Sequence, residues 1–307
     1  MRNPKAATGA YGRTVIGIGL YMLGVFFQTS ASTAAKWLTA GYPIGQLTFA
    51  RALFALPPIL ALIAFSGGIK SVATNRPAIQ LSAGLAMVTT IFLLYTSLRV
   101  LPLADAMSLL FAGPLFMTAL AGLILRERVG PRNWLAVLVG FIGVLLVLRP
   151  VGDMVQPAGM LAIGAAFTYA LASIATRSLT QTDSTNAILL YSTLVVTVIG
   201  GATCFFMWKT PTKTDLAILV FMGFAGAIGN YLMTRAFRLA QVKSLAPFDY
   251  TALVWAAIMG FILWHDLPTM WVCVGAATIV IAGIYATSHE RTADGNESGA
   301  AVSRFGH

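Results

Sequence analysis

The chain has 307 residues, of which 58% are hydrophobic and 10% are charged. Soluble domains carry about 25% charged residues, so this composition excludes a water-coated globular surface and predicts a membrane protein. The formal net charge of +10 comes from Lys and Arg residues scattered between apolar stretches, which argues against nucleic acid as a partner.

Apolar stretches fill the chain almost from end to end. A stretch of about 20 such residues is long enough to cross a hydrocarbon core of roughly 30 Å as a helix, and the runs lack the alternation of a membrane β-barrel. The predicted spans are 13–35, 43–66, 77–98, 103–125, 133–149, 156–178, 186–208, 215–238, 244–264 and 270–288. The predicted fold class is therefore an all-α membrane protein with ten transmembrane helices.

The two ends of the chain are predicted to lie outside the membrane. Residues 1–12 form a short basic segment before the first span, and the run from Thr14 to Ala35 is too long for the core of a signal peptide. We therefore interpret the first span as a retained helix. Residues 289–307 are rich in Gly, Ser, Ala and Asn, which predicts a disordered tail.

The distribution of basic residues predicts the orientation. Of the 20 Lys and Arg residues, 14 fall on the side that carries both chain ends and 6 on the other side. Because cytoplasmic connections are enriched in Lys and Arg, we expect both termini in the cytoplasm and the protein in a bacterial inner membrane. This asymmetry also accounts for the basic net charge.

The sequence contains an internal repeat. Residues 96–128 resemble residues 234–266: each segment has a basic residue, a short break and a long apolar run that ends at an acid. The repeat predicts two five-helix halves, 13–149 and 150–288. Because five is an odd number, the second half must enter the membrane inverted, and inverted repeats with a site between them are typical of secondary transporters.

These features resemble the ten-helix EamA-type branch of the drug/metabolite transporter superfamily. The motifs that carry the resemblance are Arg51 early in the second span, LPLADA (101–106), the mid-span Pro114, ERVGPRNWLAVLVGFIG (127–143) and AGIYA (282–286). Within this branch the chain looks most similar to aromatic amino acid exporters of the YddG type. The resemblance implies inner-membrane export of small metabolites through a central cavity between the two halves.

Ionisable residues within spans are costly and are therefore candidates for function. Asp249 in the ninth span could hold a coupling proton or bind a substrate ammonium, or it could simply reach water at the interface. Lys36 and Arg51 could attract a substrate carboxylate, although long basic side chains also extend to the interface. Asp105 begins the fourth span, where it could stabilise the helix N-terminus or pair with Arg99.

Other polar and aromatic residues within spans are candidates for lining a cavity. Gln28 and Ser32 are spaced i, i+4 and share one face of the first span. Aromatic side chains could form an apolar pocket with a few polar groups, although packing is an alternative role for each of them. The remaining cavity candidates are Tyr95, Phe111, Tyr169, Asn230, Tyr231, Asp249 and Trp255.

Helix-breaking residues occur in corresponding spans of the two halves. Gly113 and Pro114 lie in the fourth span, and Pro247 lies near the start of the ninth. Since proline removes a helix hydrogen bond and kinks the helix, we interpret the three residues as hinge candidates. A static kink that shapes packing is the alternative.

The leading hypothesis is a secondary transporter that exports small organic metabolites, especially amino acids and among them aromatic ones, by alternating access around a central cavity. The chain has no phosphate loop, paired-carboxylate motif or metal-ligand cluster, so we predict no catalytic residues, metal or cofactor. The expected partners are the small-molecule substrate and membrane lipid; the oligomeric state is open, and a monomer is compatible with the sequence. The alternatives are a membrane-embedded enzyme that acts on lipid or lipid-linked substrates and a passive small-solute channel.

Overall fold

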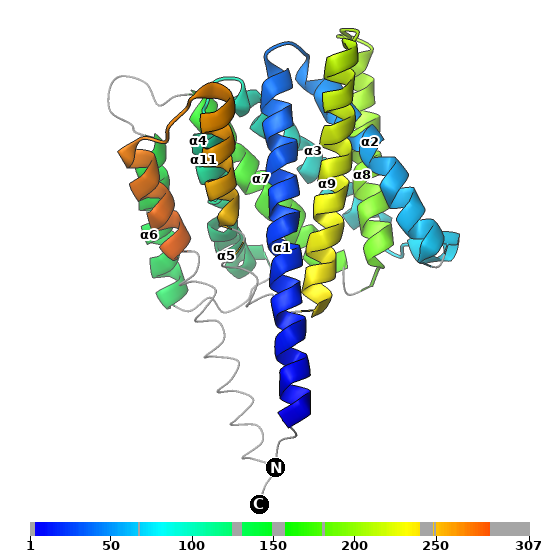
Figure 1. Cartoon of the computed structure of the whole chain (residues 1–307), viewed down its shortest axis with the longest axis horizontal. Coiled ribbons are helices and arrows are strands. Elements are labelled where there is room, and N and C mark those ends of the chain that lie inside the picture. The colour runs from blue at the N-terminus through cyan, green and yellow to red at the C-terminus, as the bar shows by residue number, and fades with distance from the viewer. Residues whose placement is uncertain are drawn as a thin grey trace, which may run out of the picture.

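The computed structural model describes residues 4–66, 68–124, 131–148, 157–179, 182–239, 248 and 250–282. Within these ranges the regular elements are helices that run up and down through one bundle (Figure 1). The first half contains α1 (Pro4–Thr39), α2 (Ile44–Phe65), the 3-10 helix η1 (Gly68–Val72), α3 (Pro77–Leu98), α4 (Leu103–Leu110), α5 (Gly113–Ile124) and α6 (Pro131–Leu148). The second half contains α7 (Pro157–Leu179), α8 (Thr185–Cys204), α9 (Lys213–Leu239), α11 (Thr251–Trp264) and a helix over Met270–Ala282.

The predicted fold class is confirmed. By length and composition, 6 of the described helices can cross a membrane, and shorter apolar helices occupy the fourth, fifth, ninth and tenth predicted spans. We call the end of the bundle at which α1 begins the N-face and the opposite end the far face. The basic residues of the sequence predict that the N-face is cytoplasmic.

Several helix bounds differ from the predicted spans. α1 begins at Pro4, within the predicted N-terminal segment 1–12, and continues to Thr39. The span predicted over 103–125 consists of two helices, α4 and α5, with a break at Phe111 and Ala112. Pro114 explains this break, because it has no backbone N–H to continue the helix and is well suited to the first turn of a new one.

Proline and serine also set helix starts. Pro77, Pro131 and Pro157 each stand at the first position of a helix, where the missing N–H is not needed. α8 begins after Ser184, whose Oγ accepts a hydrogen bond of 3.0 Å from the backbone N–H of Ala187. This serine is an N-cap that satisfies a free donor of the first turn.

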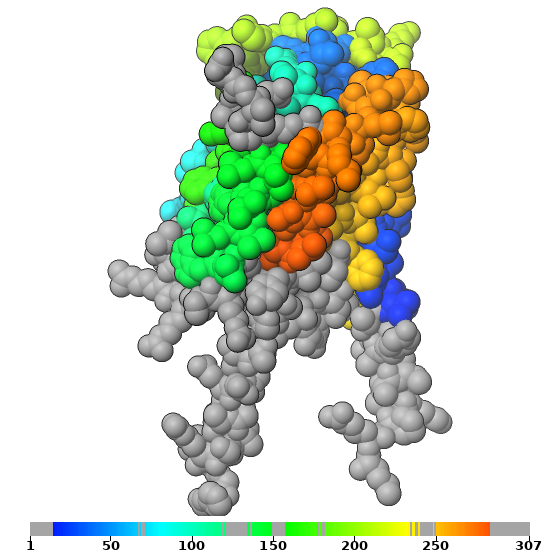
Figure 2. Space-filling view, turned by 90° about the vertical axis from the view of Figure 1, so that its left-hand side faces the viewer, coloured from blue at the N-terminus to red at the C-terminus, as the bar shows by residue number. Residues whose placement is uncertain are grey.

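Helices of one half pack mainly against helices of the other half. α1, the first span of its half, packs along α9, the third span of the other half, and α3 packs in the same way along α7. α2 packs against α8, so that second spans meet. α6 and the helix over Met270–Ala282, the two fifth spans, lie side by side (Figure 2). If the two halves are interchanged, the α1–α9 pair becomes the α7–α3 pair, and the α2–α8 pair and the pair of fifth spans become themselves. This symmetry is expected of an inverted repeat.

Two glycine pairs bring helix backbones into close contact. A Cβ atom on Gly24 of α1 would lie 3.0 Å from the carbonyl oxygen of Gly229 on α9, and one on Gly229 would lie 2.9 Å from that of Gly24. Gly143 of α6 and Gly275 meet in the same reciprocal way, at 2.8 and 2.7 Å. Small residues permit such close packing between membrane helices.

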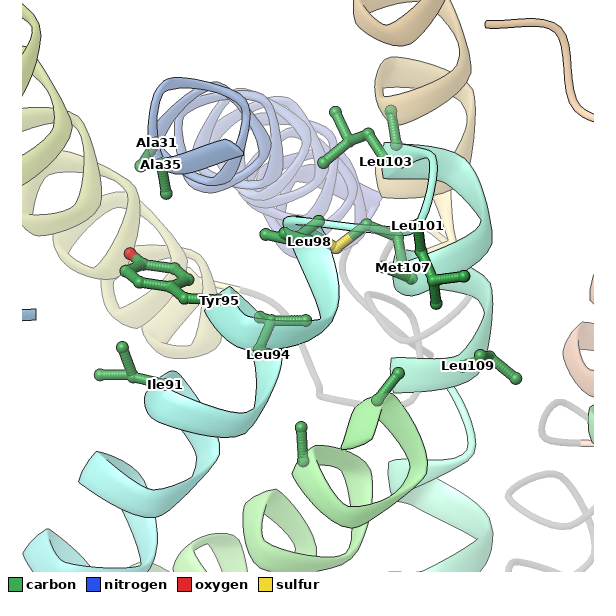
Figure 3. Close-up of a cluster of buried hydrophobic side chains, with 14 of the residues drawn as sticks. Ala31, Ala35, Ile91, Leu94, Tyr95, Leu98, Leu101, Leu103, Met107 and Leu109 are labelled. Atoms are coloured by element: carbon green, nitrogen blue, oxygen red, sulfur yellow. The ribbon is translucent and has the colours of Figure 1, made fainter. Parts of the chain in front are cut away.

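The core of the far-face half joins α1, α3 and α4. Ala31 and Ala35 of α1 lie next to Tyr95 and Leu98 of α3, and Met107 of α4 closes the cluster (Figure 3). Tyr95 is fully buried, with 0% of its surface exposed. This packing fixes the position of its hydroxyl group within the bundle.

Candidate functional site

A chain of polar side chains crosses the middle of the bundle and centres on Arg51 of α2. Its Nη1 donates a hydrogen bond of 2.8 Å to the hydroxyl of Tyr95 on α3, and its Nη2 donates one of 3.3 Å to Oε1 of Gln28 on α1. Gln28 Nε2 in turn donates to Oδ1 of Asn230 on α9 at 2.6 Å. The structure therefore brings together four residues that the sequence singled out separately, one from each of four helices.

The charged guanidinium group of Arg51 forms its described hydrogen bonds with neutral side chains. Both hydrogen-bond acceptors are uncharged, and the ion pair found among the described residues joins Lys36 to Asp266 instead. A guanidinium group has five N–H donors, so the two described bonds leave donors for a ligand. Because a partly buried charge is costly without a counter-charge, Arg51 favours an anionic group beside it.

Arg51 lines a cavity of about 310 Å³ between α2, α3, α8 and α9. This volume is at the lower end of the range of about 300–1,000 Å³ for small-molecule sites. The polar lining residues other than Arg51 are Ser192, Thr193, Asn230 and Tyr231, and the remaining wall is largely apolar, with Ala52, Ile59, Met87, Ile91, Leu189 and Val196 among its members. We call it the Arg51 cavity.

A second cavity, of about 290 Å³, lies between the Arg51 cavity and the N-face. We call it the Arg235 cavity. The two cavities share the lining residues Leu62, Leu189 and Tyr231. The two cavities therefore adjoin at these three side chains. The Arg235 cavity is lined by Leu62, Ser66, Ser71, Ser184, Thr185, Asn186, Leu189, Tyr231 and Arg235.

The far face is held by an ion pair next to an aromatic ring. Lys36 Nζ lies 3.3 Å from Oδ2 of Asp266 and donates a hydrogen bond of 3.1 Å to the carbonyl oxygen of Leu101. The same ammonium group lies 4.8 Å from the ring centre of Trp264, within the range of a cation–π interaction. These contacts join the end of α1 to the end of α11, to the segment after it and to the segment before α4.

The turn between α1 and α2 is held from two sides. Arg99 donates to the carbonyl oxygens of Thr39 and Tyr42 at 3.0 and 2.7 Å, and Lys209 Nζ donates to that of Gly41 at 2.9 Å. The hydroxyl of Tyr42 donates to Asp215 at 2.6 Å, which raises the pKa of Tyr42 above its usual value. A hollow of about 910 Å³ beside this turn shares no lining residue with the Arg51 cavity.

The other predicted cavity residues divide into those near the Arg51 cavity and those away from it. Tyr231 lines it, whereas Ser32, one turn beyond Gln28 on α1, is buried without lining it. Phe111 packs against Tyr250 with ring centres 5.2 Å apart. Tyr169 of α7 is half-exposed, and its ring would lie 3.0 Å from a Cβ placed on Gly113.

Trp255 of α11 lies near the N-face half of α1. Its ring meets that of Phe26 edge to face, with centres 5.1 Å apart. Its Nε1 is buried, and no hydrogen-bond partner occurs among the described residues. Phe111 and Tyr169 therefore lie near the break between α4 and α5, whereas Trp255 packs against α1, and none of the three lines the Arg51 cavity.

The charge and hinge candidates are placed as follows. Lys36 is engaged by Asp266, and Asp105, in the first turn of α4, is close enough to attract Lys36 electrostatically. Gly113 and Pro114 form the start of α5, at the break described above. Asp249 and Pro247 lie outside the described residues.

Three important residues were not proposed as site residues from the sequence. The sequence marks Asp266 as the acid that ends the second repeat and Arg99 as the basic residue of the first repeat and a pairing candidate for Asp105, and it marks Arg235 only as a basic residue that sets the orientation. Their roles depend on neighbours from distant helices, and no local sequence pattern identifies such neighbours.

A sequence profile of the EamA-like transporter family matches residues 15–149 and again residues 156–288. An S-adenosylmethionine uptake transporter of Rickettsia bellii is 26% identical over 91% of this chain and 95% of its own length. A riboflavin transporter of Rhizobium johnstonii is 28% identical over 93% of both chains. A pseudopaline exporter of Pseudomonas aeruginosa is 24% identical over 87% of this chain and 94% of its own length.

The fold also matches that of a solved structure. A crystal structure aligns with a TM-score of 0.64 over 90% of this chain and 97% of that chain, at 18% identity. The predicted similarity to aromatic amino acid exporters is not supported by the named relatives, which are described as transporters of other metabolites. These relatives include both uptake and export proteins.

Proposed function

Because the chain belongs to the EamA-like transporter family, we propose that it carries a small carboxylate-bearing metabolite with an apolar or aromatic body across the membrane by alternating access. The transporter family excludes the alternative of a membrane-embedded enzyme. The observation that carries the substrate class is Arg51: a guanidinium held by Tyr95 and Gln28, both neutral, on the wall of a largely apolar cavity.

The chemistry of the cavity fits such a substrate. A carboxylate can accept two parallel hydrogen bonds from a guanidinium group, and the apolar wall can bury the rest of a small molecule. Amino acids, the substrates predicted from the sequence, have this combination of groups. The modest volume of about 310 Å³ favours a molecule of their size in this state.

The arrangement of cavities and contacts supports a transport cycle. The two adjoining cavities lie between the N-face and Arg51, while Lys36, Asp266, Arg99 and Lys209 hold the far face together. In the proposed cycle this conformation exchanges substrate at the N-face. Rocking of the inverted halves then breaks the far-face contacts that join the two halves, Lys36 with Asp266 and Lys209 with Gly41, and closes the N-face.

A counterflow screen in proteoliposomes tests this proposal. Purified protein, without ATP, should exchange a labelled carboxylate metabolite for the same unlabelled compound, and the initial rate should saturate with concentration. S-adenosylmethionine and each of the common amino acids form the panel, and riboflavin, which has no carboxylate group, is the neutral comparison. Saturable exchange indicates a carrier, whereas a non-saturating flux would support the channel alternative; no flux with any of the carboxylate compounds would contradict the proposal.

Arg51→Gln and Arg51→Lys then test the role of the guanidinium. Arg51→Gln should raise the half-saturating concentration of a carboxylate substrate at least tenfold, and Arg51→Lys should restore it only in part, because an ammonium lacks the planar fork. Arg76→Gln is the matched control, since Arg76 is exposed at the N-face and lines neither cavity. Equal effects of Arg51→Gln and Arg76→Gln would contradict a specific role.

The proposal also covers the membrane in which the protein lies, its orientation there and the direction of transport. We propose that the protein lies in a bacterial inner membrane with the N-face toward the cytoplasm, and that net transport is export. The basic connections of the sequence support the orientation. Net flux in vesicles of known orientation, with a substrate gradient imposed in either direction, tests the export prediction.

A further inference from the structure

The Arg235 cavity contains a guanidinium without a described counter-charge. Arg235 lines it, and no hydrogen bond or ion pair of Arg235 occurs among the described residues. None of the lining residues is acidic. Asp183, the acid just before the lining residue Ser184, instead accepts hydrogen bonds from Thr74 and Gln80.

The surroundings of Arg235 supply further hydrogen-bonding groups. Hydroxyls of Ser66 and Thr185 and the side-chain amide of Asn186 line the same cavity. The first turn of α8, which contains Thr185 and Asn186, adds the positive partial charge of a helix N-terminus. A guanidinium, hydroxyl donors and a positive helix end around one cavity favour an anion such as a carboxylate.

The position of Arg235 on α9 links it to Arg51. Tyr231 and Arg235 are spaced i, i+4 and share one face of the helix. A Cβ on Gly226 would lie 3.7 Å from the Arg51 guanidinium, and nine residues separate Gly226 from Arg235, which corresponds to about 13 Å along the helix axis. Tyr231 lies between them and lines both cavities.

We propose that the Arg235 cavity is a second binding site, which holds the carboxylate of the substrate before it passes Tyr231 and reaches Arg51. This inference rests on the proposed function and adds to it a separate site at the N-face. The tyrosine ring, 40% exposed, separates the two sites and turns aside when the apolar body of the substrate passes.

Thiol modification tests the site without relying on transport. Ser66→Cys is introduced after Cys204 and Cys273 have been replaced by serine, in the full-length protein in liposomes. The cysteine is then modified with an anionic reagent, 2-sulfonatoethyl methanethiosulfonate, or a cationic one, 2-(trimethylammonium)ethyl methanethiosulfonate. Arg235→Gln should lower the ratio of the anionic to the cationic rate at least fivefold, because the local positive charge is lost.

Two controls identify the source of the effect. Arg76→Gln removes the same charge from the same face outside the cavity and should change the ratio less than twofold, since surface charges are screened by salt. Benzoate at millimolar concentration should slow modification by both reagents, whereas benzamide, which has the same shape without the charge, should not. The protection by benzoate should disappear in Arg235→Gln.

Each contrary result overturns the inference. A ratio that Arg235→Gln leaves unchanged, or that Arg76→Gln lowers equally, would show that Arg235 does not create a local anion site. Equal protection by benzamide and benzoate would show that the cavity does not recognise a carboxylate. None of these measurements needs transport. A contrary result here would therefore overturn the second binding site alone, whereas a failed counterflow screen would overturn the proposed function.

Discussion

Lys36 and Asp266 are 230 positions apart in the sequence, yet Lys36 Nζ and Asp266 Oδ2 lie 3.3 Å apart at the far face. The lysine ends the first span of one half, and the aspartate follows the fourth span of the other. Their ion pair therefore spans the boundary between the two inverted halves. In the proposed alternating-access cycle these halves separate at the far face, and this contact would break at that step.

We expect Lys36→Met to increase access from the far face. With Ser32→Cys, one turn deeper on α1, as reporter in the cysteine-free background, labelling by a membrane-impermeant thiol reagent from that face should become about fivefold faster. The lysine side chain is only 10% exposed, so we assign the pair about 1 kcal/mol, near the top of the range for exposed ion pairs, and 1.4 kcal/mol corresponds to a factor of ten.

Charge exchange and a surface lysine serve as controls for this pair. The double variant Lys36→Asp with Asp266→Lys should bring the labelling rate back toward that of the parent protein. Lys213→Met, which removes a charge from an exposed residue at the same face, should have little effect. A labelling rate that stays the same in Lys36→Met would mean that the ion pair does not contribute to far-face closure.

Tyr95→Phe should weaken substrate binding without unfolding the protein. The substitution removes the hydroxyl that accepts a hydrogen bond from Arg51 but keeps the buried ring. Hydrogen bonds to charged groups contribute about 1.5–3 kcal/mol, so we expect a rise of about tenfold in the half-saturating concentration in counterflow. Tyr191→Phe, on α8 outside the described cavity walls, is the control; equal changes in both variants would contradict the role of Tyr95.

Gly229→Ala should destabilise the bundle, because the new Cβ would lie 2.9 Å from the carbonyl oxygen of Gly24. Overpacking of this kind costs about 1–3 kcal/mol, and the melting temperature should fall by several degrees. Gly19→Ala on α1 is the control, since its Cβ would meet no atom within 4 Å. Gly19→Ala should leave the melting temperature unchanged or raise it, because alanine is more favourable than glycine within a helix.

Asp183→Asn should destabilise the protein in a pH-dependent way. Hydrogen bonds, first from Thr74 and then from Gln80, hold the pKa of Asp183 below its usual value of 3.8, despite the opposite effect of burial. A carboxyl with a lowered folded-state pKa stabilises the fold above the unfolded-state pKa and loses that contribution as the pH falls through the folded-state value.

Thermal unfolding at several pH values measures this effect. The melting temperature of Asp183→Asn should lie a few degrees below that of the parent protein at pH 7 and pH 5, and the difference should shrink once the pH falls below 3.8. Thr74→Ser keeps the donor hydroxyl and should behave like the parent, whereas Thr74→Val should lose part of the stability. A difference that is the same at every pH would exclude a role for the charge.

The helical type of the spanning elements followed from the sequence for a simple physical reason. Backbone groups in lipid must be satisfied within the spanning element, so long uncharged runs without alternation predict helices. Proline at 114 also predicted a disturbance of the fourth span, and the structure shows a break between α4 and α5 there. The sequence did not predict that α1 would continue to Thr39.

The sequence by itself determined ten membrane helices and two inverted halves, because length, apolarity and an odd helix number leave few other arrangements. The tertiary structure decided which polar groups meet: Arg51 reaches Tyr95, 44 positions away, and Gln28 reaches Asn230, 202 positions away. Membrane helices are apolar on most of their surface, so the hydrophobic pattern does not tell which helix lies beside which. Only packing through small residues, as between Gly24 and Gly229, selects the neighbours and thereby creates the site.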